Sequence, residues 1–222
     1  MMSIKSRHTI FIWFGGVLTN TVTEITLQSL QSDQYASGFK LPRSEINKLA
    51  DQLSLGMISP HSYCDGVIKI TNSTLDIITL EELIPRRASL NKSVMNLINS
   101  VSGEYEKWLV SDYPESWYQE IASREDLSSM YPAERMIFTS QGDLEKMVPD
   151  VFDYLARASG HSLDRCVLID SKSSRAVEAV RHGLSSIIYV YPDRLKHEFA
   201  LRGILETEEE VLHPDISKRV DI

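Results

Sequence analysis

The sequence contains few of the residues that build disulfide frameworks and metal sites. Its 222 residues include two cysteines, Cys64 and Cys166. Two cysteines do not make a disulfide framework, so we predict a protein of a reducing compartment, the cytoplasm. The six histidines form no HxxxH pair and no CxxC pair occurs, which argues against a zinc site. Cys166 lies in an apolar run, so we interpret it as a small buried apolar side chain.

Long apolar and basic runs are also missing. The apolar run Thr9–Leu18 contains two glycines, lacks a small-residue cleavage site and is too short to span a bilayer. No run of five or more lysines and arginines occurs, and the formal net charge is -8. We therefore predict neither a membrane nor a nucleic acid as a partner. The acidic segment from Glu206 to Glu210 predicts a polar C-terminal tail over residues 206–222.

Short apolar runs are present, and they are typical of the buried strands of a parallel sheet. These runs are Thr9–Phe14, Lys107–Ser111, Arg135–Thr139, Arg165–Asp170 and Ser185–Val190. Segments with helical character separate the last four runs, as at Val151, Phe152, Leu155 and Ala156. Alternation of strands and helices indicates βαβ units. We therefore predict an α/β fold with a doubly wound, five-stranded parallel sheet.

The long stretch between the first two runs is helical in character. Its apolar residues recur at helical spacing, at Ile46, Leu49, Ala50 and Leu53, and again at Val94, Leu97, Ile98 and Val101. Pro42 suits a first helical position, and Ser59 followed by Pro60 is typical of an N-cap with proline at the first helical position. We predict a helical cap at residues 20–95, inserted after the first strand of a core formed by residues 1–19 and 96–205.

Four segments in this order resemble the motifs of the haloacid dehalogenase-like (HAD) superfamily, in its branch with a helical cap. Thr9–Thr19 is similar to the first motif, an apolar strand followed by Asp-x-Asp or Asp-x-Gly and then Gly-Val-Leu. Trp108–Asp112 is similar to the second, a strand that ends in Ser or Thr. Lys146, followed by Pro149 and Phe152, resembles the third motif, in which a lysine opens a helix. Val167–Ser171, followed by Ala179 and Gly183, resembles the fourth motif. Leu55–Ser59 resembles a turn of the cap, and the segment around Ser140 and Gln141 is most similar to the sugar-phosphate phosphatase branch.

The resemblance implies a phosphatase chemistry at the carboxyl ends of neighbouring strands. In the family, an aspartate attacks phosphorus and a second acid two residues later protonates the leaving group. Magnesium is held by the first-motif aspartate and a fourth-motif acid. The second-motif hydroxyl and the third-motif lysine bind the phosphoryl oxygens.

This sequence departs from the family pattern at the nucleophile. Trp13 occupies that position, and an indole has no nucleophilic oxygen and cannot bind magnesium. Gly15 occupies the acid/base position, as in some active relatives, and the fourth motif reads Asp170 followed by Ser171. One carboxylate is a poor magnesium site, so we expect no catalytic residue and no cofactor, with Asp170 as the one candidate metal ligand. The relic active site then comprises Trp13, Gly15, Ser111, Lys146, Asp170 and Ser171.

Several residue roles stay open at this point. Ser111 and Lys146 form a surviving anion site, or else Ser111 caps a turn and Lys146 pairs with Asp170. Trp13 plugs the old phosphate pocket, or it forms one wall of a new binding pocket. Asp112, which we expect to point into its loop, and Asp65 in the cap are candidate substitute nucleophiles.

Three functions are compatible with this pattern. The first, which the loss of the nucleophile favours, is a non-catalytic protein that binds a small ligand or a protein partner. The second is a phosphoric monoester hydrolase that acts on a small phosphorylated metabolite through a displaced nucleophile. The third is a structural role, for example as a homo-oligomer. The identity of the ligand or partner does not follow from the fold.

Overall fold

The computed structural model describes residues 8–32, 41–125, 127, 130–140 and 151–205. Its sheet is parallel throughout, with the strand order β3-β2-β1-β4-β5. The strands are β1 (His8–Trp13), β2 (Tyr105–Ser111), β3 (Met136–Phe138), β4 (Cys166–Asp170) and β5 (Ser185–Ile188). The prediction of a five-stranded parallel sheet is therefore confirmed, with each predicted strand found in its place.

The most apolar predicted strand lies at the centre of the sheet. β1 pairs with β2 on one side and β4 on the other, and every β1 residue after His8 is buried. A strand covered on both faces needs apolar side chains on both, which explains the uninterrupted apolar run. The edge strand β3 is shorter than predicted, because a 3₁₀ turn at Ala133–Arg135 takes up its first residue.

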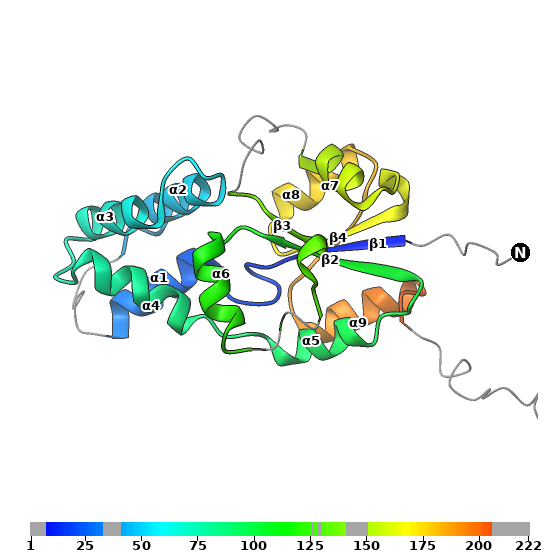
Figure 1. Ribbon diagram of the computed structural model, residues 1–222, viewed down its shortest axis with the longest axis horizontal. Helices are drawn as coiled ribbons and strands as arrows, with labels where there is room; N and C mark the ends of the chain where they lie inside the picture. Colours follow the sequence, from blue (N-terminus) through cyan, green and yellow to red (C-terminus); the bar gives the residue numbers. More distant parts are fainter. Residues whose placement is uncertain (1–7, 33–40, 126, 128–129, 141–150, 206–222) are drawn as a thin grey trace, which may run out of the picture.

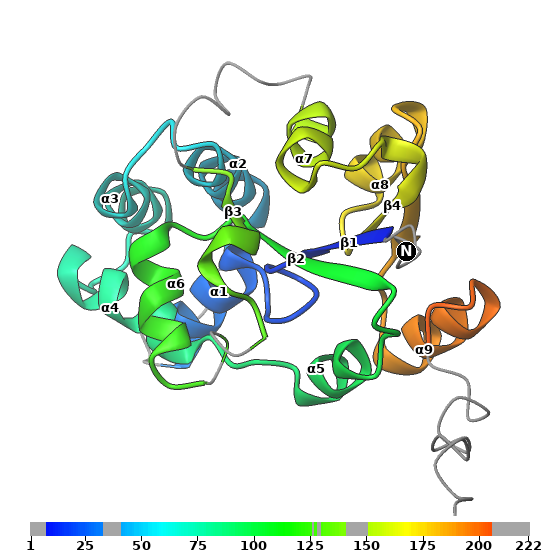
Figure 2. The same cartoon turned by 45° about the vertical axis from the view of Figure 1, so that its right-hand side comes forward.

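Helices cover both faces of the sheet. The helices are α1 (Val22–Ser32), α2 (Arg43–Ser54), α3 (Pro60–Thr71), α4 (Ile77–Arg87), α5 (Lys92–Asn99), α6 (Glu115–Ala122), α7 (Val151–Ser159), α8 (Ser173–Arg181) and α9 (Pro192–Leu201). In Figure 2, α7 and α8 lie on one side of the strands, and α5 and α9 lie on the other. This is the doubly wound arrangement that the sequence predicted.

The helical insertion after β1 forms a separate group of helices. Figure 1 shows α1 to α4 together on the left, beside the carboxyl ends of the strands. These helices contact one another, whereas α5 packs against α9 of the core. The predicted cap limit at residue 95 falls within α5 and stays a prediction.

Local signals within the insertion predicted helix starts well. The Ser59 side chain caps α3 by accepting a hydrogen bond from Ser62 N, and Pro60 is the first residue of that helix. Pro42 is the N-cap residue of α2 and not its first helical residue, so the predicted start was one residue early. The spacing of apolar residues does not determine the first residue of a helix to within one position.

Both cysteines are buried, as predicted for Cys166. Burial raises the pKa of the Cys166 thiol to about 11 and that of Cys64 to about 12. Both side chains are therefore neutral thiols at physiological pH and act as packing groups. No helix among the described residues is long and apolar enough to cross a membrane.

Candidate functional site

The fold brings three of the predicted site residues to one edge of the sheet. Trp13, Ser111 and Asp170 are the last residues of β1, β2 and β4, which are neighbouring parallel strands. Gly15 and Ser171 follow in the loops after β1 and β4. Lys146 lies outside the described residues. The carboxyl edge of such a sheet, beside its central strand, is where ligand crevices form in α/β folds.

Trp13 is buried under an arginine. The Trp13 side chain is 2% exposed, and the Arg175 guanidinium carbon lies 3.4 Å from the centre of its ring. This distance places the cation directly on the face of the indole, where the ring attracts it. The Trp13 Nε1–H group is buried and has no hydrogen-bond partner among the described residues. The ring therefore has a structural contact with Arg175 and leaves one donor unsatisfied.

Asp170 is held by the same arginine. Its carboxylate is fully buried, and Arg175 binds both oxygens, through Nε to Oδ2 and through Nη2 to Oδ1 at 3.1 Å. The backbone N–H of Lys172 donates a further hydrogen bond of 2.9 Å to Asp170 Oδ1. A bidentate guanidinium gives a buried carboxylate both its charge balance and its hydrogen bonds. In the described part of the chain, Arg175 is thus the cationic partner of Asp170.

The expectation that Asp112 points into its own loop is wrong. Asp112 Oδ1 accepts a hydrogen bond of 3.0 Å from the backbone N–H of Gly15, across from β2 to the loop after β1. A Cβ atom at position 15 would lie 2.6 Å from the same oxygen, so Gly15 leaves the space that the Asp112 carboxyl fills. Burial raises the pKa of the Asp112 carboxyl, while Arg175 and the Gly15 N–H hold back part of that rise.

The serine hydroxyls take part in local contacts. Ser111 Oγ lies 3.2 Å from both the N and the O of Tyr113, accepting from the former and donating to the latter. It therefore turns toward the start of the next segment. Ser171 Oγ lies against Gly16, where a Cβ atom would be 2.1 Å away, and Gly16 has a φ of 85°. Only glycine suits this position, since both the space and the backbone angle exclude a side chain.

A cavity of about 350 Å³ lies where the helical insertion meets the strand ends. The loop after β1, the start of α1, one face of α2 and the start of α8 surround it. It is lined by Gly15, Thr21, Val22, Thr23, Asn47, Ala50, Asp51, Ser54, Asp112, Ser171, Lys172 and Arg175. Trp13 is not among these residues, because Arg175 lies over its ring. The cavity has the size and the mixed polar lining of a site for a small ligand.

Two contacts hold the insertion against the core beside this cavity. Lys172 Nζ lies 3.0 Å from Asp51 Oδ1 on α2, and both side chains are half or more exposed. Thr139 Oγ1, after β3, donates a hydrogen bond of 2.6 Å to the Ser54 carbonyl at the end of α2. An exposed ion pair contributes little to stability, so the partly buried Thr139 hydrogen bond is the stronger contact of the two.

Sequence reasoning missed Arg175, Lys172 and Asp51 and misplaced Asp112. Arg175 is the third residue of α8, so the first turn of this helix carries it back over the end of β4. A basic residue five positions after the motif carboxylate Asp170 was the signal available for it. Asp51 carried no signal, because its role depends on how α2 packs on the core.

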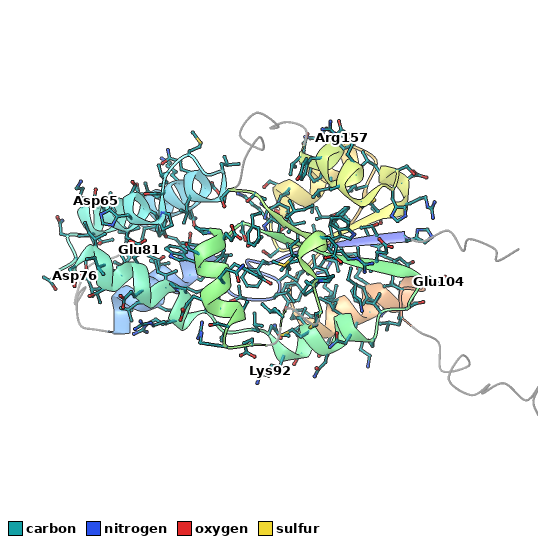
Figure 3. The ribbon with its side chains drawn as sticks, viewed as in Figure 1. Asp65, Asp76, Glu81, Lys92, Glu104 and Arg157 are labelled. Atoms are coloured by element: carbon teal, nitrogen blue, oxygen red, sulfur yellow. The ribbon has the colours of Figure 1, made fainter. Side chains whose placement is uncertain are left out.

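Asp65, the other candidate substitute nucleophile, lies away from this site. It pairs with Lys69 on the same helix, at 2.6 Å, and does not line the cavity. Figure 3 shows it at the outer part of the insertion, on α3. An i, i+4 ion pair on a helix surface is an ordinary solvated contact.

The described residues do not fit a magnesium ion of the family type. No group of three or more His, Cys, Asp or Glu side chains in the described part of the chain could hold a metal. Both Asp170 oxygens are already bound by Arg175, and Trp13 offers no oxygen. A divalent cation at Asp170 would have to displace a guanidinium that is fixed by two hydrogen bonds and an aromatic ring.

Solved structures of HAD-fold enzymes resemble this chain. A HAD family enzyme from Bacteroides thetaiotaomicron superposes with a TM-score of 0.67 at 14% identity, over 87% of this chain and 98% of that one. The same enzyme has been solved with magnesium and inorganic phosphate, and that complex gives a TM-score of 0.58 at 14% identity over 93% and 100% of the two chains.

A second relative has a different chemistry. L-2-haloacid dehalogenase from Xanthobacter autotrophicus, with chloropropionic acid covalently bound, superposes with a TM-score of 0.59 at 11% identity, over 90% of this chain and 85% of that one. No family model and no curated protein matches the sequence. Identities of this size establish the fold alone. The chain therefore has the α/β fold of the HAD-superfamily hydrolases and dehalogenases, with a helical insertion after the first strand.

Proposed function

We propose that this protein is a non-catalytic member of the HAD fold class that binds a small ligand in the cavity between α2 and the strand ends. The observation that supports this most directly is Arg175. Its guanidinium neutralises Asp170 and covers Trp13, the two positions that hold magnesium in active relatives. An internal cation thus stands where the family needs an exchangeable one.

The missing nucleophile supports the same proposal. Trp13 aligns with the aspartate that attacks phosphorus, and its ring is buried under Arg175. Covalent catalysis needs a nucleophilic oxygen within reach of the substrate. Tryptophan offers only an N–H donor. The resemblance to the sugar-phosphate phosphatase branch accordingly concerns the fold, and the phosphatase activity of that branch is not proposed for this protein.

Ligand binding is supported by the cavity itself. Its lining keeps four charged side chains and several hydroxyl and amide groups at the edge of the sheet where related enzymes bind substrates. A fold that had lost all function at this edge would have no requirement for an open, polar cavity there.

We expect no magnesium-dependent hydrolysis of phosphate monoesters. Highly purified protein is assayed with p-nitrophenyl phosphate and a panel of small sugar phosphates, with magnesium and with chelator. The absent nucleophile predicts rates equal to the buffer blank in both conditions. Turnover that requires magnesium and disappears in Asp170→Asn or Lys146→Met would refute the proposal.

A second candidate function rests on the position of Asp112. Its carboxyl occupies the space beside Gly15, which is the acid/base position of the family, and it lines the cavity. A hydrolase with Asp112 as a displaced nucleophile would lose all turnover in Asp112→Asn. The position of Asp112 argues against this candidate, since its carboxyl lies beside Gly15, at the acid/base position, and not at the end of β1, where the nucleophile of the family stands.

A further inference from the structure

The charges in the cavity do not balance among the described residues. Lys172 and Asp51 pair with each other at its rim, and Arg175 is bound by Asp170 beneath it. Asp112 is the remaining charged group of the lining. The described site therefore has two cations and three carboxylates, so one negative charge has no dedicated counter-ion.

Arg175 cannot serve both carboxylates equally. It binds both oxygens of Asp170, and its charge offsets only part of the rise that burial causes in the pKa of Asp112. Among the described residues, the backbone N–H of Gly15 is the hydrogen-bond donor to Asp112 Oδ1. A half-buried carboxylate with one neutral donor is electrostatically costly, and a nearby positive charge removes that cost.

The excess negative charge of the cavity has the opposite sign to the charge of a phosphate-binding site. A phosphate site needs a surplus of positive charge, from a metal, a lysine or helix N-termini. Among the described residues of the lining, the guanidinium of Arg175 is bound by Asp170 and the ammonium of Lys172 pairs with Asp51. A phosphate would meet Asp112 directly and be repelled by it.

We propose that the cavity binds a small organic cation, a primary or secondary amine, with its ammonium group against the Asp112 carboxylate. This inference rests on the proposed ligand-binding function. The Ser54, Ser171 and Asn47 side chains also line the cavity and suit hydroxyl groups on the rest of the ligand. An ammonium group donates up to three hydrogen bonds and supplies the missing positive charge.

The test is a binding measurement on the full chain with defined probes. Ethanolamine, 1,3-diaminopropane and spermidine are compared with ethylene glycol, a neutral match for ethanolamine, and with inorganic phosphate. A thermal-shift assay identifies which probes bind, and isothermal titration calorimetry then measures the affinity of those probes. At least one amine should raise the melting temperature in a saturable way, while the neutral alcohol and phosphate should leave it unchanged.

The decisive variant is Asp112→Asn. It removes the charge and keeps an oxygen for Gly15 N, so the affinity for the amine should fall about 10- to 100-fold, as for loss of one charged hydrogen bond. Asp65→Asn, the same change on the exposed face of α3, should leave the affinity unchanged. Asp112→Ser, a smaller neutral side chain, gives the same comparison if the asparagine variant folds poorly.

Three results would overturn the inference. The first is that no amine binds, and the second is that amine affinity is the same in Asp112→Asn as in the wild type. The third is that an amine binds only after Lys146→Met, which would mean that Lys146 already supplies the counter-charge. None of these three results involves turnover in the hydrolysis assay. Magnesium-dependent turnover would refute the proposed function, so the two failures are distinguishable.

Discussion

Replacing Trp13 with alanine is expected to lower the free energy of unfolding by about 3–5 kcal/mol, the usual cost of truncating a buried tryptophan. The ring is almost fully buried at the end of the central strand, and it also supports the Arg175 guanidinium. Its removal leaves a cavity and takes away the aromatic face on which Arg175 rests. Chemical denaturation of the wild type and Trp13→Ala, followed by circular dichroism, measures the difference.

Trp13→Phe is the matched control. It keeps a ring under Arg175 and removes the Nε1–H donor, which is buried without a partner among the described residues. Removing such a donor relieves part of its desolvation cost, which offsets part of the lost volume. We expect this variant to be much closer to the wild type than Trp13→Ala. A wild-type stability for Trp13→Ala would mean that the ring does not fill space in the core.

Placing an aspartate at position 13 should not by itself create a metal site. In Trp13→Asp, the introduced carboxylate would lie beneath Arg175, which would pair with it as well as with Asp170. Magnesium should therefore leave the melting temperature of Trp13→Asp unchanged. In the double variant Trp13→Asp/Arg175→Met, two buried carboxylates lack a cation, and the protein should be strongly destabilised in chelator.

Magnesium should stabilise that double variant clearly. At a concentration of 100 times its dissociation constant, a bound ligand contributes about 2.7 kcal/mol. The measurement is a set of melting curves of the single and double variants with magnesium and with chelator, and Arg175→Met alone serves as the control. A magnesium effect of equal size in Trp13→Asp would mean that Arg175 does not block the site. A further Gly15→Asp change also requires a smaller side chain at Asp112, which fills that space.

The arrangement of the sheet was predictable because its strands are buried on both faces. An uninterrupted apolar run such as Ile10–Phe14 has few structural alternatives once its length is too short for a buried helix. The helical insertion followed from apolar spacing, and Ser59 with Pro60 located one helix start to the residue. The length of β3 was not predictable, since the 3₁₀ turn at Ala133–Arg135 depends on packing and not on periodicity.

The site was predictable only as far as strand ends determine it. The motif order placed Trp13, Ser111 and Asp170 at neighbouring strand ends, as the structure has them. The partners of these residues come from helix geometry and loop contacts. Arg175 reaches Asp170 through the first turn of α8, and Asp112 reaches Gly15 across a gap that only the folded loop closes. The contact between Asp112 and Gly15 is tertiary, and no local pattern in the sequence encodes it, whereas the short spacing between Asp170 and Arg175 was a local signal.

The central claim is that Arg175 takes the place of an exchangeable metal ion beside Asp170. Isothermal titration calorimetry of magnesium into the wild-type protein tests it most directly, with Asp170→Asn as the control. Because both Asp170 oxygens are bound by Arg175, the account predicts no saturable heat of binding in either protein. Micromolar magnesium affinity in the wild type that is lost in Asp170→Asn would contradict it.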